Sequence, residues 1–384
     1  MKYPIYMDYN ATTPLDKRVL EAIMPYLTDH FGNAASISHA YGWKAAEAVD
    51  KARLQVASLL GVTEKEIVFT SGATESINLA IKGSFEALKS KGNHIITVKT
   101  EHKAVLDTCA YLGKNGAQIT YLDVDNQGNI DLINLENEIR PDTILISAMA
   151  ANNETGTIFP LSEIGEIAKK HKVLFHTDAT QAIGKIPVDK IAGNIDLLSF
   201  SGHKIYGPKG VGVLFVRKNL KIVAQQDGGN HERGNRSGTL NVPGIVGLGE
   251  AAEICQKTLI EESLRLSSLR NTFEMGILES LPFAKINGDT LHRLPNTSNI
   301  CFGNIDGEQL LLNLNEIAIS NGSACNSAST KPSHVLKALG LTDDLAFSSV
   351  RFSLGRFTQK QDVETAIAHV SQVVLQMQPS NSIA

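Results

Sequence analysis

The chain has 384 residues, 42% of them hydrophobic and 20% charged, with a formal net charge of −4, as is typical of a globular protein large enough for two domains. The slight acidity and the lack of a basic block argue against direct nucleic-acid binding. No stretch approaches the ~20 apolar residues of a membrane span, and no signal-peptide core is present near Met1, so we expect a cytoplasmic protein without membrane association.

From about residue 15 to residue 255, short apolar runs alternate with longer amphipathic segments. The expected strands are 66–69, 94–98, 118–122, 143–148, 173–176, 195–200 and 212–216. Helices are expected between most of them, including 44–60, which ends at Gly61, and 161–171. This alternation predicts an α/β fold, with a mostly parallel sheet flanked by helices.

The pattern changes after a long proline-free helical stretch at 249–281. Beyond it, short strands (297–302, 317–320 and 350–354) mix with helices (307–314, 331–339 and 359–377). We therefore expect a large domain of residues 15–255 and a smaller α+β domain of residues 1–14 and 256–384. An active site between two such domains is the usual arrangement.

Polar residues follow the ends of several expected strands. Segment 68–78 reads as a strand, a glycine turn and a helix start, where backbone N–H groups and the Thr74 hydroxyl can bind phosphate. Helix capping by Ser71 or Thr74 is the alternative. His102 and Asn153 also follow strands. Either both are ordinary loop residues, or His102 stacks its ring on a cofactor and Asn153 donates a hydrogen bond to it.

The strand at 195–200 ends in Ser201-Gly-His-Lys204, and the strand before it leads into Asp178 and Gln181. In α/β folds, residues at such strand ends carry the chemistry. A lysine held there loses hydration, which lowers its pKa and allows its amine to form a Schiff base. A cofactor that needs a lysine and a carboxylate partner for its ring nitrogen is pyridoxal phosphate (PLP).

The four cysteines are far apart and form no Cys-x-x-Cys pair, which argues against disulfides and structural zinc. Cys109, Cys255 and Cys301 have apolar neighbours, and we expect them to be buried. Cys325 lies in a run of small polar residues that is typical of an exposed loop with a reactive thiol. Arg351 lies on an expected interior strand, where it needs a substrate carboxylate or a structural salt bridge.

Taken together, these motifs resemble the NifS/IscS-like cysteine desulfurases, the group I branch of the class V aminotransferases, of PLP fold type I. The resemblance runs from Tyr6-Met-Asp-Tyr-Asn-Ala-Thr-Thr-Pro14 to Arg351-Phe-Ser-Leu-Gly355. Between them it includes Ser71-Gly-Ala-Thr-Glu-Ser76, Glu101-His-Lys103, Asp178-Ala-Thr-Gln181, Ser201-Gly-His-Lys204, Arg236-Ser-Gly-Thr239 and Gly322-Ser-Ala-Cys325. Ala34 and Asn230 depart from the pattern, which often has proline and glycine there. Longer family members also carry an extra C-terminal segment that helps to dock the iron–sulfur scaffold.

The resemblance implies a role for each candidate residue. Lys204 holds PLP as a Schiff base, Asp178 pairs with the pyridine nitrogen and Gln181 pairs with the ring hydroxyl. His102 stacks on the ring and assists proton transfer, Asn153 and Arg351 meet substrate and cofactor oxygens, and Cys325 is the nucleophile that takes sulfur. Ala73, Thr74, Ser201 and His203 hold the phosphate, and Thr239 comes from the neighbouring subunit of a homodimer.

The implied reaction converts L-cysteine to L-alanine and leaves a persulfide on Cys325. The sulfur then passes to an acceptor, either an iron–sulfur scaffold or a protein that thiolates tRNA or DNA. Among PLP enzymes, the alternative is an aminotransferase or selenocysteine lyase; Cys325 argues against transamination, which needs no thiol.

Two further alternatives lie outside that class. A zinc hydrolase would use His176, Asp178 and His203, but Lys204 beside His203 disfavours a cation there. A catalytically idle sulfur-transfer scaffold is disfavoured by the intact lysine, aspartate and cysteine set.

Overall fold

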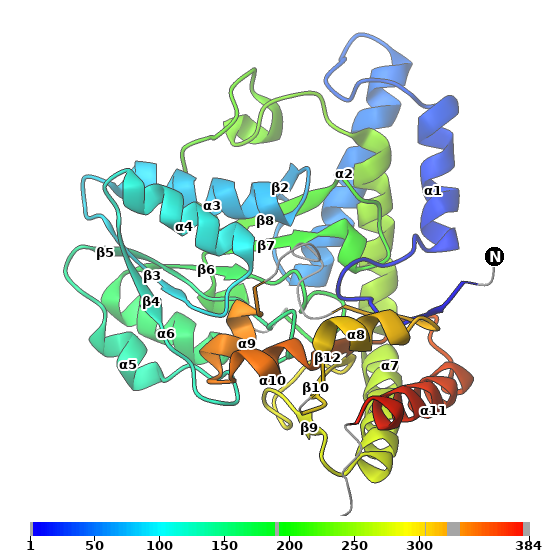
Figure 1. Cartoon of the computed structure of the whole chain (residues 1–384). Helices are drawn as coiled ribbons and strands as arrows, with labels where there is room; N and C mark the ends of the chain where they lie inside the picture. The colour runs from blue at the N-terminus through cyan, green and yellow to red at the C-terminus, as the bar shows by residue number, and fades with distance from the viewer. Residues whose placement is uncertain (1–2, 189–191, 304, 321–330, 379–384) are drawn as a thin grey trace, which may run out of the picture.

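The computed structural model describes residues 3–188, 192–303, 305–320 and 331–378. In this part of the chain, a seven-stranded sheet has the order β2-β8-β7-β6-β5-β3-β4 (Figure 1). Its strands are β2 (Ile67–Thr70), β3 (His94–Val98), β4 (Gln118–Leu122), β5 (Thr143–Ser147), β6 (Leu174–Asp178), β7 (Leu197–Ser201) and β8 (Gly212–Val216). β8 is antiparallel to both of its neighbours, and the other pairs are parallel. The predicted α/β fold with a mostly parallel sheet is therefore confirmed.

Helices cover both faces of this sheet, which explains why five of its seven strands are buried along their whole length. α3 (Ala73–Leu88) and α4 (Lys103–Lys114) pack on one face in a cluster that includes Ile77, Val105 and Ile95 of β3. The helices of the opposite side are α1 (Lys17–Thr28), α2 (Ala40–Leu60), α5 (Leu132–Asn137), α6 (Leu161–His171) and α7 (Val242–Ser280) (Figure 1). Both layers bury the sheet that positions the candidate site.

The long helix α7 begins at Val242, seven residues before the expected start at 249. Pro243 occupies its first turn, where a missing N–H group costs nothing because that group has no intrahelical partner. The Asn241 side chain caps the helix by accepting a hydrogen bond from the Gly244 N–H group at 3.1 Å. α7 then runs from the large sheet to the C-terminal elements (Figure 1).

A second hydrophobic cluster, which includes Met7, Phe273 and Phe352, lies around the far end of α7. Its antiparallel sheet consists of β9 (Lys285–Ile286), β10 (Thr297–Cys301) and β12 (Ser349–Ser353). The accompanying helices are α8 (Gly307–Asn313), α9 (His334–Ala338), α10 (Asp343–Phe347) and α11 (Lys360–Met377). The predicted 331–339 helix starts only at His334, because Ser333 caps it after Pro332.

The N-terminus joins this C-terminal region. β1 (Ile5–Tyr6) pairs in parallel with β11 (Ile317–Ala318). The chain then crosses toward the large sheet, where the Thr13 N–H group donates to the His203 carbonyl at 3.0 Å. No helix in the described part of the chain combines the length and the apolar character needed to cross a membrane.

Candidate active site

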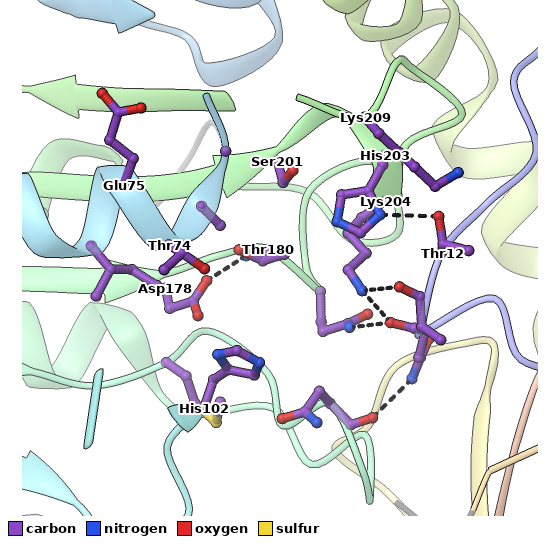
Figure 2. Close-up of a pocket in the computed structure, with 18 of the residues that line it drawn as sticks. Thr12, Thr74, Glu75, His102, Asp178, Thr180, Ser201, His203, Lys204 and Lys209 are labelled. Carbon is purple, nitrogen blue, oxygen red and sulfur yellow. Dashed lines mark hydrogen bonds between the residues drawn. The ribbon is translucent and has the colours of Figure 1, made fainter. Parts of the chain in front are cut away.

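The candidate residues gather at the carboxyl ends of the parallel strands, where α/β folds place their ligands. A cavity of about 540 Å³ lies there. Its lining includes ten predicted residues: Ala73, Thr74, His102, Asn153, Asp178, Gln181, Ser201, His203, Lys204 and Arg351 (Figure 2). Thr239 is exposed and does not line this cavity. The predicted nucleophile, Cys325, lies outside the described residues.

The N-terminus of α3 forms one end of the cavity. α3 has Gly72 as its N-cap residue and no side-chain cap, so neither Ser71 nor Thr74 caps it as the alternative required. The Glu75 carboxylate turns back to accept from the Ser71 N–H group at 2.7 Å and pairs with Arg236 at 2.8 Å. The uncapped N–H groups and the helix dipole therefore favour a bound anion.

Close contact between two glycines shapes this anion site. A Cβ atom added to Gly212, at the start of β8, would lie 2.5 Å from the Gly72 Cα atom and 2.8 Å from the Phe200 carbonyl oxygen. Such distances are too short for carbon atoms, so only glycine at position 212 lets the strand pack against the turn before α3.

Lys204 projects from a short 3₁₀ turn, Gly202–Lys204, that follows β7. Its Nζ atom donates to the carbonyl oxygens of Asn10 at 2.5 Å and Ala11 at 2.6 Å (Figure 2). The neighbouring His203 ring is within hydrogen-bond distance of the Thr12 hydroxyl, 3.0 Å from Nδ1 to Oγ1. Residues 10–12 thus form a wall of the cavity, and none of them was among the predicted site residues.

Asp178 is the last residue of β6 and is 6% exposed. Its Oδ1 atom accepts from the Thr180 N–H group at 3.0 Å, and its carboxylate lies on the cavity side near Thr74 (Figure 2). Glu101 is fully buried, and burial raises its pKa well above the ordinary value. The nearby negative charge of Asp178 is the second cause of this rise. Burial thus favours the neutral form of Glu101, which does not line the cavity, while Asp178 does.

The zinc alternative is wrong for the described residues. Both ring nitrogens of His176 are engaged, Nδ1 with the Ser147 hydroxyl at 2.8 Å and Nε2 with the Ser199 hydroxyl at 3.0 Å. Burial lowers the pKa of His176 to about 3, so the ring is neutral in the core. Within the described ranges, no group of three His, Cys, Asp or Glu side chains is arranged to hold a metal ion.

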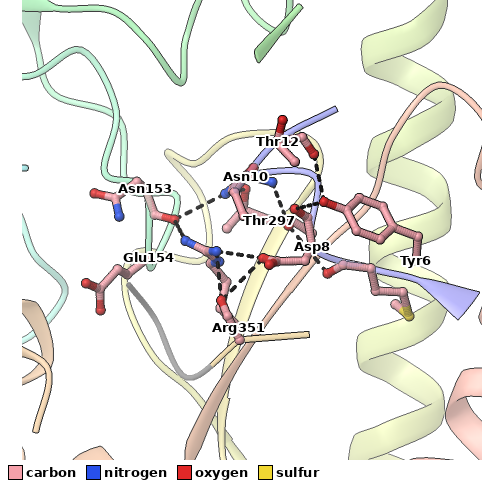
Figure 3. A network of polar contacts seen from close by, with 12 residues as sticks. Tyr6, Asp8, Asn10, Thr12, Asn153, Glu154, Thr297 and Arg351 are labelled. Atoms are coloured by element: carbon pink, nitrogen blue, oxygen red, sulfur yellow. Dashed lines mark hydrogen bonds and ion pairs between the residues drawn. The ribbon is translucent and has the colours of Figure 1, made fainter. Parts of the chain in front are cut away.

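Arg351 connects the cavity to the N-terminal segment. Its Nη2 atom lies 2.7 Å from Asp8 Oδ1 and 2.7 Å from the Ser320 hydroxyl oxygen (Figure 3). Its Nη1 atom donates to the Asn153 backbone carbonyl at 2.9 Å. The structural salt bridge that the sequence left open is present, and the same side chain lines the cavity.

The donor set of this cavity fits PLP. An amine at Lys204, a carboxylate at Asp178 and an anion cradle at the start of α3 match the aldehyde, the ring nitrogen and the phosphate of that cofactor. His203 is suited to the phosphate end as a neutral donor or acceptor, because burial and the cations Lys204 and Lys209 lower its pKa to about 4.

Comparisons with known proteins agree with this geometry. The family model described as "Aminotransferase class-V" matches residues 5–365. The chain is 53% identical over 369 residues to the cysteine desulfurase IscS of Anaeromyxobacter dehalogenans (strain 2CP-C), covering 96% of this chain and 91% of that protein. A solved structure titled "NIFS-LIKE PROTEIN" has a TM-score of 0.91 at 39% identity, covering 97% of this chain and 100% of that chain. Another, "SspA in complex with cysteine", has a TM-score of 0.81 at 41% identity, covering 91% and 98%. The chain therefore belongs to the IscS- and NifS-like cysteine desulfurases of the class V aminotransferase family.

Proposed function

We propose that this protein uses PLP to convert L-cysteine to L-alanine and carries the released sulfur as a persulfide on Cys325. The observation that carries the proposal is the meeting of Lys204, Asp178 and the uncapped start of α3 in one cavity. The similar solved SspA structure, whose title names bound cysteine, supports cysteine as the substrate.

Each part of PLP has a proposed partner in the described chain. Lys204 would link to the cofactor covalently, Asp178 would accept a hydrogen bond from the ring nitrogen, and Gln181 would meet the ring hydroxyl. Ala73, Thr74, Ser201 and His203 would hold the phosphate, with His102 stacked on the ring. When bound, PLP supplies an electron sink for the α-carbon of an amino acid.

The surrounding residues hold the substrate and move its protons. The Lys204 amine and the His102 ring line the cavity and are the groups that we assign to transfer of the substrate α-proton. The carbonyl oxygens of Asn10 and Ala11 accept from the Lys204 amine in its unlinked form, and would hold its Nζ atom whenever the covalent link to PLP is open. Arg351 would bind the substrate carboxylate, with Asn153 beside it.

Sulfur transfer requires a thiolate. The Cys325 sulfur would attack the substrate sulfur, so that an S–S bond forms as the Cβ–S bond breaks. The electron pair of that bond stays on Cβ, which takes a proton to become the methyl group of alanine. The other thiols are poor candidates because all three are buried, and burial raises the pKa of Cys109 to about 12 and that of Cys255 to about 11.

We also propose a homodimer. Exposed large apolar side chains gather in the segment that contains α1 and α2: Leu20, Met24, Leu27, Phe31, Ile37, Tyr41, Trp43 and Leu54. An exposed apolar surface of this kind is typical of a protein interface. Thr239, exposed and outside its own cavity, would reach the cavity of the second copy.

The remaining proposals concern the division of the chain into domains and the protein that accepts the sulfur. The pairing of β1 with β11 supports assigning residues 1–14 to a small domain with 256–384, opposite a large domain of 15–255. The sulfur acceptor would be an iron–sulfur scaffold or a tRNA- or DNA-thiolation protein in the cytoplasm, in line with the IscS relatives.

The deciding experiment measures alanine and persulfide together. Purified protein is treated with L-cysteine, alanine is quantified, and each cysteine-containing peptide is weighed by mass spectrometry. Wild type should form alanine and add one sulfur to the Cys325 peptide. Cys325→Ser should retain the visible band of bound PLP yet form no alanine, whereas Cys301→Ser, the matched control, should behave as wild type. Alanine formation by Cys325→Ser, or a persulfide on another cysteine, overturns the proposal, and keto-acid release would indicate an aminotransferase.

A further inference from the structure

A second lysine lies behind the cavity and has no role in the mechanism above. Lys185 follows β6 in the turn that contains Gln181, and it is only 9% exposed. It does not line the main cavity, but together with Lys204 it lines a small void next to it. A buried lysine is costly unless its donors are satisfied.

The Lys185 side chain has two partners, and both are amides. Its Nζ atom donates to Gln181 Oε1 at 2.7 Å and to Asn10 Oδ1 at 3.4 Å. The first distance is that of a strong hydrogen bond, and the second is a longer, weaker contact. Lys185 therefore contacts two residues of the cavity lining without lining the cavity itself.

The contact with Lys185 determines which way the Gln181 amide points. A glutamine amide has one end that only accepts and one end that only donates. Lys185 donates to Oε1, and the Asn10 carbonyl oxygen, which only accepts, takes a hydrogen bond from Nε2 at 2.9 Å. Rotating the amide by half a turn would break both contacts. One of the two Nε2 protons then remains for a ligand in the cavity that Gln181 lines.

Asn10 is oriented in the same way. Its Oδ1 atom accepts from Lys185 and from Asn296 Nδ2, the latter at 3.2 Å. Its Nδ2 atom therefore donates to Thr297 Oγ1 at 2.9 Å and to the Asn153 carbonyl at 3.2 Å (Figure 3). The backbone carbonyl that receives the Gln181 N–H group thus belongs to a residue that is fixed on both sides.

We propose that Lys185 is a positioning residue that makes Gln181 donate, rather than accept, a hydrogen bond at the ring oxygen of the cofactor. This inference rests on the proposed PLP function. Burial, followed by the charge of Lys204, lowers the pKa of Lys185 to about 7. The contact does not depend on that ionisation, because a neutral amine retains two N–H groups.

The test is a double-mutant cycle read from the visible absorption band of the bound cofactor. Lys185→Met, Gln181→Ala and the double variant are purified with PLP, and the band is recorded against pH together with the rate of PLP loss on dilution. Lys114→Met, which removes an exposed lysine of α4, is the control. We expect Lys185→Met to shift the pH midpoint of the band in the same direction as Gln181→Ala and to speed PLP loss by about tenfold, equivalent to about 1.4 kcal/mol.

The decisive comparison is the double variant, which should match Gln181→Ala alone. A wild-type spectrum in Lys185→Met, or equal shifts by Lys185→Met with and without Gln181, would overturn the proposal. If Lys185→Met does not fold, Lys185→Leu, which also lacks a donor, replaces it, and its shift must disappear in the Gln181→Ala background. An unshifted spectrum or an additive shift in that variant counts against the proposal. Failure of the PLP function itself would look different, because wild type would then show no visible band.

Discussion

The Asp8 carboxylate lies 2.7 Å from the Arg351 guanidinium, on the arginine that we assign to the substrate carboxylate. The pair is largely buried, with side-chain exposures of 15% for Asp8 and 2% for Arg351. Asp8 therefore binds Arg351 through a carboxylate, the same group by which the substrate would bind it. An incoming carboxylate has to share or replace this partner.

This relationship predicts the effect of Asp8→Asn. The amide retains an oxygen near Arg351 but removes the competing charge, so L-alanine, the product, should bind about tenfold more tightly, equivalent to about 1.4 kcal/mol. Binding is measured by titrating the visible band of the PLP enzyme, with Asp107→Asn as an exposed control. Weaker binding would instead mean that Asp8 holds Arg351 in its working position.

Lys204→Ala should abolish turnover and remove the visible band that marks the covalent link to PLP. The two carbonyl contacts of Nζ are also lost, so the free energy of unfolding should fall by about 1–3 kcal/mol. Alanine release, absorption and urea unfolding are measured in parallel. Lys209→Ala removes another lysine of the cavity lining and should keep the band. Normal alanine production by Lys204→Ala would refute the assignment.

Asp178→Asn should slow catalysis more than it weakens folding. The neutral amide is a weaker partner for a protonated ring nitrogen, and the loss of a charge-assisted hydrogen bond of about 1.5–3 kcal/mol corresponds to a kcat about 10–150 times lower. Single-turnover alanine formation tests this, with PLP content measured to show that the site is still loaded. An unchanged kcat would assign the ring nitrogen to a different residue.

Gly212→Ala should distort the anion site at the N-terminus of α3 without changing any residue that we assign to catalysis. Its new Cβ atom would lie 2.5 Å from Gly72 Cα, so the turn before α3 has to move. We expect PLP to dissociate about tenfold faster, equivalent to about 1.4 kcal/mol. Gly113→Ala is the matched control, because the nearest atom to its Cβ, Ile119 Cγ1, is 3.7 Å away. Equal PLP retention in the two variants would show that the cradle tolerates the displacement.

Acidification should destabilise the fold through His176. Burial lowers its pKa from the ordinary histidine value of 6.5 to about 3 in the folded chain, so the unfolded chain binds the proton more readily. The free energy of unfolding is therefore unaffected by this histidine above about pH 6.5 and falls as the pH is lowered toward 3. At about pH 5 the decrease should be about 2 kcal/mol. In urea unfolding, His176→Asn should be less stable at neutral pH but should lose less stability on acidification. Parallel losses in the two proteins would contradict this account.

The strands of the large sheet were predictable because each contains a local cluster of apolar residues. Strands 94–98, 118–122 and 212–216 have the expected bounds, and the others differ by one or two residues at their ends. Two-residue strands such as β1 and β9 escaped prediction. Their existence depends on partners far away in the chain, and two residues carry no periodicity of their own.

The site was predictable to the same extent. Residues at strand ends could be recognised because the sheet itself brings them together, as with Asp178 and Lys204. The wall at residues 10–12 could not be predicted from local pattern, since it arises from contacts across more than 170 residues. Lys185 lies only four residues after Gln181, but its second contact, with Asn10, spans 175 residues. Residues 10–12 belong to a family motif, but nothing in their composition or spacing predicts that they lie at the cavity.

The N-terminal wall also sets when the site can be completed during synthesis. Residues 5–13 are synthesised long before their partners, because β1 pairs with Ile317–Ala318 and Asn10 is held by Asn296 and Thr297. The nascent large sheet can form while these partners are still untranslated, but its cavity then lacks one side. Cofactor loading should therefore follow translation of the residues that hold this wall, as far as Ala318.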